Sequence, residues 1–187
     1  MEQPRSDHGT SGNRDDSIEI KPENTPIMFS GKRYKLTGPD VALPMVIKLQ
    51  INNNSVLRVF VNPGNQADIL YMSAFVKMGL SESMLKPLEA YLKGNFGDGV
   101  PVKGYIDLDT TFGKGVNAKL IKVRYVVVDS LSAYNVVIGR PSLSDLSAVI
   151  SVADLSMKYP IGEGKVGVVT ADLDMARKCH EMCPYYV

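Results

Sequence analysis

The first regular element that the hydrophobic pattern predicts is a β-hairpin. Residues 45–51 (MVIKLQI) contain alternating apolar and polar side chains, as expected for a strand with one buried face. The asparagines at 52–54 indicate a turn, and residues 56–61 (VLRVFV) are mainly β-branched and apolar, which indicates a second strand. The hairpin leads directly into a polar turn that begins at Asn62.

The rest of the chain predicts further short strands and a few short helices. Apolar residues at helical spacing, followed by Gly79, predict a helix over residues 72–80. Pro141 in a first turn predicts a helix over 141–146, and a last helix is predicted over 171–182. Further strands are predicted in 91–108 (two strands around a glycine-rich turn), 120–128, 136–138, 149–152 and 155–159, with the last two completing the sheet. This pattern favours an all-β fold, either a closed barrel or a sandwich.

Composition divides the chain into a polar tail and one folded domain. Residues 1–23 contain too little apolar material to form a core, so we expect a disordered tail over residues 1–26. We expect a barrel domain over 27–170 and a C-terminal helix and tail over 171–187. Because no apolar run reaches membrane-spanning length and no secretory signal begins the chain, we expect a cytoplasmic protein. The net charge of +1 indicates no overall electrostatic attraction to nucleic acid or to a membrane.

Two short motifs contain the candidate chemistry. Asn62-Pro63-Gly64 follows an apolar strand, and Gly139-Arg140 follows the apolar residues 136–138. Taken alone, the first motif is typical of an ordinary β-turn, because each of its residues favours turn positions. Together the motifs resemble the paired signature of retropepsins, in which one apolar strand ends in Asp-x-Gly and a later one in Gly-Arg. Other blocks, in the same order, resemble the protease segment of plant gypsy-type LTR retrotransposons: 67–71 (ADILY), 74–75 (AF), 78–80 (MGL), 100–102 (VPV), 104–106 (GYI) and 139–141 (GRP).

The resemblance implies a single-lobed acid protease barrel, because the core between residues 44 and 159 is too short for a second lobe. Proteases of this kind use two carboxylates that share a proton, so a single-lobed chain must form a homodimer to assemble them. This chain has Asn62 at the position of the catalytic Asp. An amide neither accepts a proton near neutral pH nor donates an acidic one, so we expect no peptide hydrolysis.

The turn departs from the retropepsin pattern at other positions as well. Pro63 stands where many retropepsins have a Thr or Ser whose hydroxyl bonds across the dimer, although some plant elements share that proline. Asn65 and Gln66 stand where a Ser-Ser pair is common. The turn is expected to keep its shape while its chemistry has changed.

The resemblance also assigns a flap and a supporting charge pair. The glycine-rich hairpin falls where retropepsins have the flap that covers the substrate, although alone it would be an ordinary surface turn. The flap residues are Asn95, Phe96, Gly97, Asp98 and Gly99. Structural support for the turn is expected from Asp68, Gly139 and Arg140, with the Asp68 carboxylate bound by the Arg140 guanidinium.

Three functions fit these expectations. The chain is an inactivated aspartic endopeptidase of a retrotransposon Gag-Pol polyprotein, a non-catalytic dimerisation and peptide-binding module, or a decayed transposon fragment. The expected partners are a second copy of the chain and a peptide or polyprotein segment in the cleft. Cys179, His180 and Cys183 contain potential zinc ligands, but a zinc site needs four and the only other histidine is His8. We therefore expect no metal and no cofactor.

Overall fold

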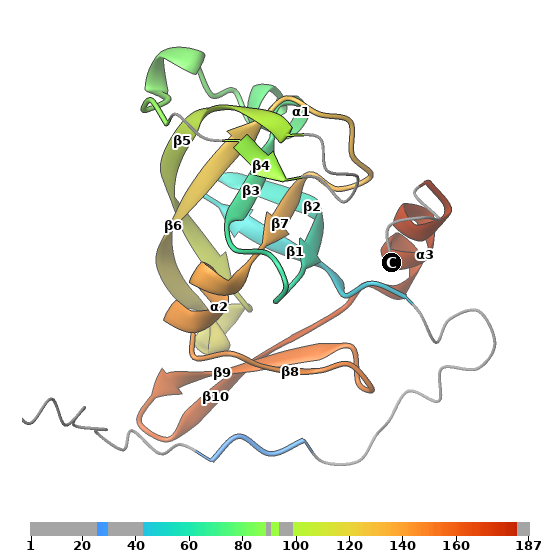
Figure 1. Cartoon of the computed structure of the whole chain (residues 1–187). Helices are drawn as coiled ribbons and strands as arrows, with labels where there is room; N and C mark the ends of the chain where they lie inside the picture. The colour runs from blue at the N-terminus through green and yellow to red at the C-terminus, as the bar shows by residue number, and fades with distance from the viewer. Residues whose placement is uncertain (1–25, 30–42, 89–90, 94–98, 183–187) are drawn as a thin grey trace, which may run out of the picture.

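The computed structural model describes residues 26–29, 43–88, 91–93 and 99–182, and it is built mainly of β-strands (Figure 1). The strands are β1 (Val46–Ile51), β2 (Asn54–Val61), β3 (Asp68–Tyr71), β4 (Tyr91–Lys93), β5 (Gly99–Phe112), β6 (Lys119–Val128), β7 (Val136–Ile138), β8 (Val149–Ser151), β9 (Ser156–Gly162) and β10 (Lys165–Thr170). The α-helices are α1 (Met72–Lys77), α2 (Arg140–Asp145) and α3 (Leu173–Met182), and the short 3-10 helices are η2 (Glu82–Met84) and η3 (Gly115–Asn117).

Six strands form a closed barrel in the order β1-β2-β7-β3-β6-β5. The pairing of β1 with β5, at Gln50 opposite Thr111 and Ile51 opposite Thr110, closes the ring. Strand β4 adds to β5 outside this ring. The predicted all-β barrel is therefore confirmed, and so is the predicted hairpin, because β1 and β2 pair antiparallel.

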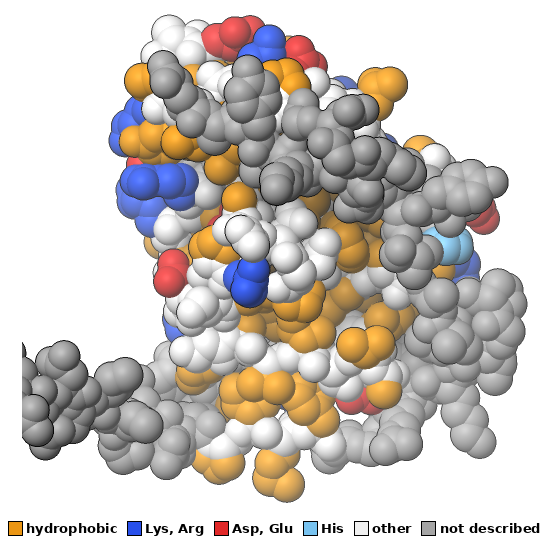
Figure 2. Space-filling model, viewed as in Figure 1, with side chains coloured by type: hydrophobic (Ala, Val, Ile, Leu, Met, Phe, Trp, Pro, Cys, Tyr) orange, Lys and Arg blue, Asp and Glu red, His pale blue; other side chains and the backbone are white. Residues whose placement is uncertain are grey.

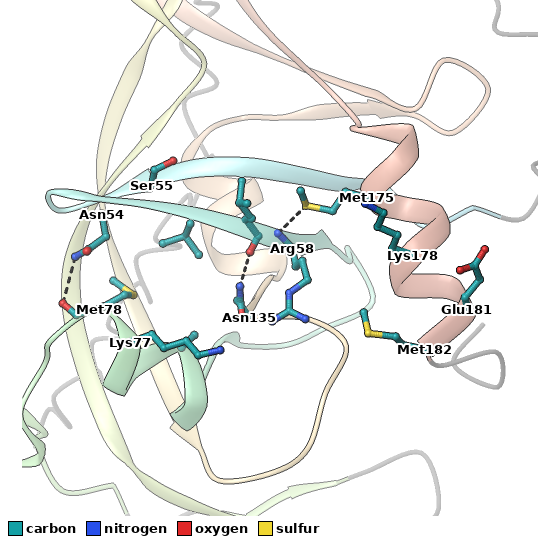
Figure 3. A pocket seen from close by; sticks show the side chains of 13 residues that line it. Asn54, Ser55, Arg58, Lys77, Met78, Asn135, Met175, Lys178, Glu181 and Met182 are labelled. Carbon is teal, nitrogen blue, oxygen red and sulfur yellow. Dashed lines mark hydrogen bonds between the residues drawn. The ribbon is translucent and has the colours of Figure 1, made fainter.

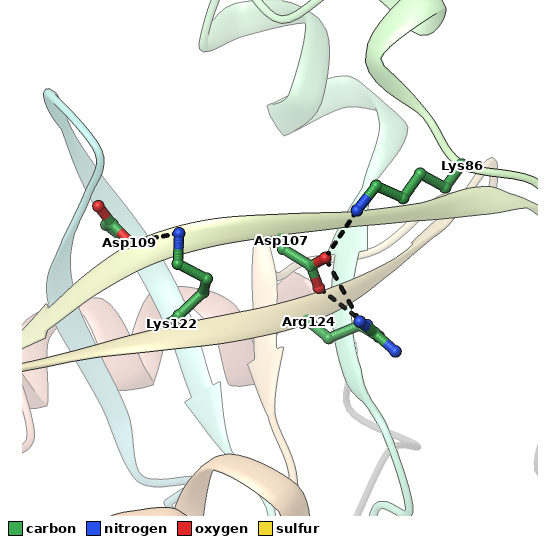
Figure 4. Close-up of polar contacts among 5 residues, drawn as sticks. All are labelled: Lys86, Asp107, Asp109, Lys122 and Arg124. Carbon is green, nitrogen blue, oxygen red and sulfur yellow. Dashed lines mark hydrogen bonds and ion pairs between the residues drawn. The ribbon is translucent and has the colours of Figure 1, made fainter.

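The barrel wall formed by β5 and β6 is fixed in register by opposite charges on its outer face (Figure 4). Asp107 lies opposite Arg124, whose Nε is 2.8 Å from the carboxylate, and Lys86 reaches the same carboxylate at 3.1 Å. Asp109 and Lys122 form the next cross-strand pair at 3.3 Å. Opposite charges placed directly across a strand pair favour this register over a slipped one.

Strand β7 brings distant parts of the chain together. It pairs parallel with the end of β2, where Val61 lies opposite Ile138, and antiparallel with β3. Strand β3 in turn pairs parallel with β6. Because β2 and β7 run in the same direction, the segments that follow them, at Asn62 and Gly139, leave the sheet side by side.

The C-terminal strands correct one sequence prediction. Segments 149–152 and 155–159 were expected to complete the sheet, but β8 and β9 pair with β10 in a separate three-stranded sheet that lies below the barrel in Figure 1. The reason is local: a tight turn through Glu163 and Gly164, both at positive φ, folds β10 back onto β9. The hydrogen-bonding edge of β9 is then occupied by β10 on one side and β8 on the other. The pattern had not indicated β10.

Two apolar clusters hold these parts together. The larger fills the barrel, with Phe75, Phe112 and Tyr125 fully buried. The smaller lies under α3 and includes Val46, Tyr134 and Cys179, so the predicted C-terminal helix packs outside the barrel core. None of the helices in the described part of the chain is long and apolar enough to cross a membrane.

Candidate active-site turn

The turn that follows β2 is fixed to β7 by its backbone. The Asn62 N–H donates to the Ile138 carbonyl at 2.9 Å, which continues the ladder between the two parallel strands. The Asn65 N–H donates to the Asn62 carbonyl at 3.1 Å and closes the turn. This turn therefore begins at a defined point of a rigid sheet, where a functional side chain can be held accurately.

The Asn62 side chain bonds within the turn that it begins. Its Oδ1 accepts a hydrogen bond from the Gly64 N–H at 3.0 Å, and its Nδ2 lies 3.5 Å from Asn65 Oδ1. The side chain is half-buried, whereas Pro63 and Gly64 are exposed. An amide in this place supplies a hydrogen-bond donor and an acceptor but no titratable proton.

Gly139 is where the later motif meets the turn. A Cβ atom on this glycine would lie 2.4 Å from the Ala67 carbonyl oxygen and 2.9 Å from the Asn65 carbonyl oxygen. The next N–H, that of Arg140, donates to the Asn65 carbonyl at 2.9 Å. Only glycine permits the two backbones to approach this closely.

Asp68 supports the junction from inside. Its side chain is buried, with the residue only 2% exposed, and its two oxygens accept hydrogen bonds from the N–H groups of Gly139 at 2.7 Å and Ser142 at 3.2 Å. Burial raises the pKa of the Asp68 carboxyl to about 6, against the opposing effect of these hydrogen bonds. The carboxylate ties β3 to the first turn of α2.

The predicted bond between the Asp68 carboxylate and the Arg140 guanidinium is wrong. In the described part of the chain these two side chains form no ion pair, and the carboxylate instead accepts the backbone N–H groups of Gly139 and Ser142. Arg140 begins α2 and its side chain is exposed. The support role expected for Arg140 thus falls to its backbone N–H.

The structure thus places Asn62, Pro63, Gly64, Asp68 and Gly139 at one junction. The predicted flap positions Asn95, Phe96, Gly97 and Asp98 lie outside the described residues, and Gly99 begins β5. Sequence reasoning missed the Ser142 N–H and the carbonyl groups of Asn65 and Ala67, because backbone groups are the same whatever the residue type. One signal was available: Pro141 predicts a first helical turn, whose N–H groups are free to meet an acid.

Of the candidate zinc ligands, Cys179 and His180 lie on α3, whereas Cys183 and His8 lie outside the described residues. Cys179 lies on the buried face of α3, with its Sγ 3.7 Å from the Ala133 carbonyl oxygen. Over the residues that the structure describes, no group of three His, Cys, Asp or Glu side chains lies together in a way that could hold a metal ion. Cys179 therefore acts as a small apolar side chain of the second cluster.

Comparison with known proteins gives the fold. No family model and no curated protein matches the chain. The retroviral protease-like domain of Ddi1 from Leishmania major aligns with a TM-score of 0.52 and 15% identity, over 70% of this chain and 95% of that chain. The chain has the retropepsin-like fold.

Two more solved structures with this retropepsin-like fold match the chain at lower TM-scores. A retropepsin-like aspartic protease from Rickettsia conorii matches with a TM-score of 0.45 and 19% identity, over 66% of this chain and 80% of that chain. EIAV protease complexed with the inhibitor HBY-793 matches with a TM-score of 0.45 and 19% identity, over 62% of this chain and 99% of that chain.

Proposed function

We propose that the chain is a retropepsin-derived domain that forms a homodimer and binds a peptide segment without hydrolysing it. The observation that carries this proposal is Asn62 at the start of a turn that is held in place by β7, Gly139 and Asp68. The retropepsin-like fold and the paired motif support placing the catalytic position at this turn. The residue there lacks the carboxylate that the chemistry requires.

The missing carboxylate cannot be supplied from nearby. In an aspartic protease one carboxyl group stays protonated and its partner carboxylate takes a proton from the attacking water. A homodimer of this chain contributes two amides, which do neither. Asp68 is the next acid in the sequence, but its two oxygens accept hydrogen bonds from α2 and its side chain is buried. The geometry thus favours binding over hydrolysis.

Restoring the carboxylate tests this proposal. We expect the purified chain to leave a mixed peptide library uncut at mildly acidic pH, whereas Asn62→Asp cuts it at a rate at least about a hundredfold above background. The cleavage should be blocked by pepstatin, which binds aspartic protease sites. Mass spectrometry of the library measures both results. Pro63 offers no hydroxyl to the dimer, so the restored activity should stay below that of an intact enzyme.

The matched control is Asn65→Asp, which places the same charge three residues further along the same turn. Its side chain already faces Asn62 within the turn, so the change alters charge without moving the backbone. We expect Asn65→Asp to remain inactive. Pepstatin-sensitive cleavage by the unmodified chain, or equal cleavage by both variants, would contradict the assigned position.

A homodimer is proposed because each chain contains one half of the expected site. A symmetric interface would place the two Asn62 turns opposite each other across the two-fold axis. Apolar side chains support a contact surface on the β8–β10 sheet: Val149 is 45% exposed, Val152 76% and Val168 43%. Figure 2 shows hydrophobic side chains gathered on this sheet, on the face of the molecule that also contains α2.

Sedimentation equilibrium tests the dimer. We expect a monomer–dimer equilibrium at tens of micromolar chain, and Val152→Asp should raise the dissociation constant about tenfold, because a buried unpaired charge opposes association. The control is Val76→Asp on α1, where the side chain is 61% exposed and lies at the opposite end of the molecule from the β8–β10 sheet (Figure 1). A strict monomer at these concentrations would contradict the dimer, and equal weakening by both variants would contradict this interface.

We also propose that the chain derives from the protease segment of a plant gypsy-type retrotransposon polyprotein. The order of the sequence blocks between residues 67 and 141 supports this origin. The alternative, a decayed fragment without a selected role, predicts neighbouring reverse-transcriptase and RNase H motifs that are broken by stop codons. Genomic sequencing on both sides of the reading frame distinguishes the two.

A further inference from the structure

A second pocket lies apart from the Asn62 turn. It has a volume of about 670 Å³ and lies between β2, the end of α1 and α3 (Figure 3). None of its lining residues belongs to the turn at 62–68 or to the helix start at 139–142. The wall consists mainly of β2 residues and of side chains from Lys77, Met78, Met175, Lys178 and Met182. Its volume is within the range of ligand-binding pockets in proteins.

The charges around this pocket are mostly positive. Arg58, Lys77 and Lys178 line it together with a single acid, Glu181. In the described part of the chain none of these four side chains forms an ion pair, and the Arg58 guanidinium instead donates to the neutral Asn135 side chain at 2.9 Å. Figure 3 shows Lys77 and Arg58 directed toward Asn135, with Glu181 pointing away from them. The pocket therefore has an uncompensated positive charge.

The floor of the pocket is an open strand edge. Asn54, Ser55 and Val56 of β2 pair with β1 on one side, but β7 begins to pair with β2 only at Val59. Within the described residues no other strand covers the remaining edge. Asn135 occupies one end of it, because its side chain donates to the Leu57 carbonyl at 2.8 Å and its N–H to the Arg58 carbonyl at 2.9 Å. Such an edge offers backbone donors and acceptors to an added strand.

Arg58 marks an irregular point of this edge. Its φ of 56° is uncommon for a residue other than glycine and coincides with the bulge in the pairing of β1 with β2. Its N–H donates to the Met175 sulphur at 3.1 Å, and a thioether is a weak acceptor. Met78 and Met182 also line the pocket, and methionine side chains adapt to varied apolar partners.

From these contacts we propose that the pocket binds an extended peptide segment of alternating acidic and apolar residues. The peptide adds as a strand along residues 54–57 of β2, and its carboxylates meet Arg58, Lys77 and Lys178. Successive side chains of a strand point to opposite sides, so alternation turns all the carboxylates of the peptide to one side, toward the cations. Met175 and Met182 lie on the same helix as Lys178 and supply apolar contacts beside the charges. A small anion would satisfy the charges but would use neither the strand edge nor the thioethers. This site is separate from the Asn62 turn and does not depend on the function proposed for it.

Fluorescence anisotropy with a labelled, end-capped Val-Glu-Val-Glu-Val-Glu peptide tests the proposal on the full chain. We expect saturable binding that weakens as salt concentration rises, because partly exposed charges are screened. The same peptide with lysine in place of glutamate should not bind. Equal binding of both peptides, or binding that does not depend on salt, would overturn the charge assignment.

Substitutions locate the site. Lys77→Glu and Lys178→Glu are changes at exposed side chains, and each should weaken binding about tenfold by replacing an attraction with a repulsion. The control Lys114→Glu makes the same charge change at an exposed lysine outside the pocket and should leave binding unchanged. Arg58→Gly removes the guanidinium while allowing the positive φ, so it should weaken binding without unfolding β2. Equal effects at Lys77, Lys178 and Lys114 would place the peptide elsewhere.

The strand addition has a separate test. A peptide with alternate backbone nitrogens methylated keeps its charges but loses half of its backbone donors, and we expect it to bind at least about tenfold more weakly. Acetate and inorganic phosphate, at concentrations matched for ionic strength with chloride, should not displace the labelled peptide. Equal binding of the methylated peptide, or displacement by these anions, would identify a simple anion site and overturn the proposal.

Discussion

Gly139→Ala is expected to lower the free energy of unfolding by about 3 kcal/mol or more. The backbone of Gly139 is extended, with φ of −100° and ψ of −169°, so alanine fits its conformation. The cost is steric, because the new methyl group would lie 2.4 Å from the Ala67 carbonyl oxygen. To make room, α2 must move away from the turn, and the bond from the Arg140 N–H to the Asn65 carbonyl is lost. Urea unfolding followed by circular dichroism measures the loss.

The matched control is Gly164→Ala in the turn between β9 and β10. Gly164 has a φ of 72°, and a methyl group added to it would meet no other part of the chain within 4 Å, so alanine there is strained but does not clash. That strain costs about 1 to 2 kcal/mol. We expect the Gly139 variant to lose clearly more stability than the Gly164 variant. The reverse order would show that the close contact with Ala67 does not hold the turn.

The parts of the fold that sequence predicted are those set by local pattern. The hairpin of β1 and β2 follows from alternation and from a polar turn between two apolar runs. Strand β10 was missed because its alternation is short and interrupted by Gly167. The same omission led to the wrong sheet for β8 and β9, since β10 and β8 together occupy both edges of β9 and leave none to pair with the barrel.

In the candidate site, too, sequence predicted some features, whereas others depend on the three-dimensional structure. The resemblance predicted that the start of the later helix supports the Asn62 turn, and the pairing of β2 with β7 places Asn62 and Gly139 side by side. The partner of Asp68 was predicted wrongly because the sequence displays the Arg140 side chain but not the N–H groups of a helix's first turn. Opposite charges in two motifs suggest an ion pair, but α2 directs its backbone N–H groups, not its first side chain, at the acid. Whether the Arg140 side chain or the backbone N–H groups bind Asp68 depends on the direction of α2 in space, which the sequence does not show.

Asp68→Ala is expected to destabilise the chain by about 3 kcal/mol, because it leaves two buried N–H groups, those of Gly139 and Ser142, without acceptors. Arg140→Ala, at an exposed side chain, should change stability by less than about 0.5 kcal/mol. The two changes should be additive, since the side chains form no ion pair. Urea unfolding of both single variants and the double variant at neutral pH measures these differences. A coupling energy well above the error of measurement would indicate that Asp68 and Arg140 form an ion pair, as the sequence suggested.

The pH dependence of stability separates the Asp68 charge from its hydrogen bonds. The pKa of this carboxyl is raised from 3.8 to about 6, so between these values the folded state holds a proton that the unfolded state releases. The stability that this proton contributes is therefore fully present below the lower pKa and is lost as pH rises through the higher one. The pKa of Asp107 shifts in the opposite direction, because hydrogen bonding to Arg124 lowers it. Asp68→Asn does not titrate, so its stability should be flatter over the same pH range. An unchanged slope in Asp68→Asn would assign the pH dependence to another group.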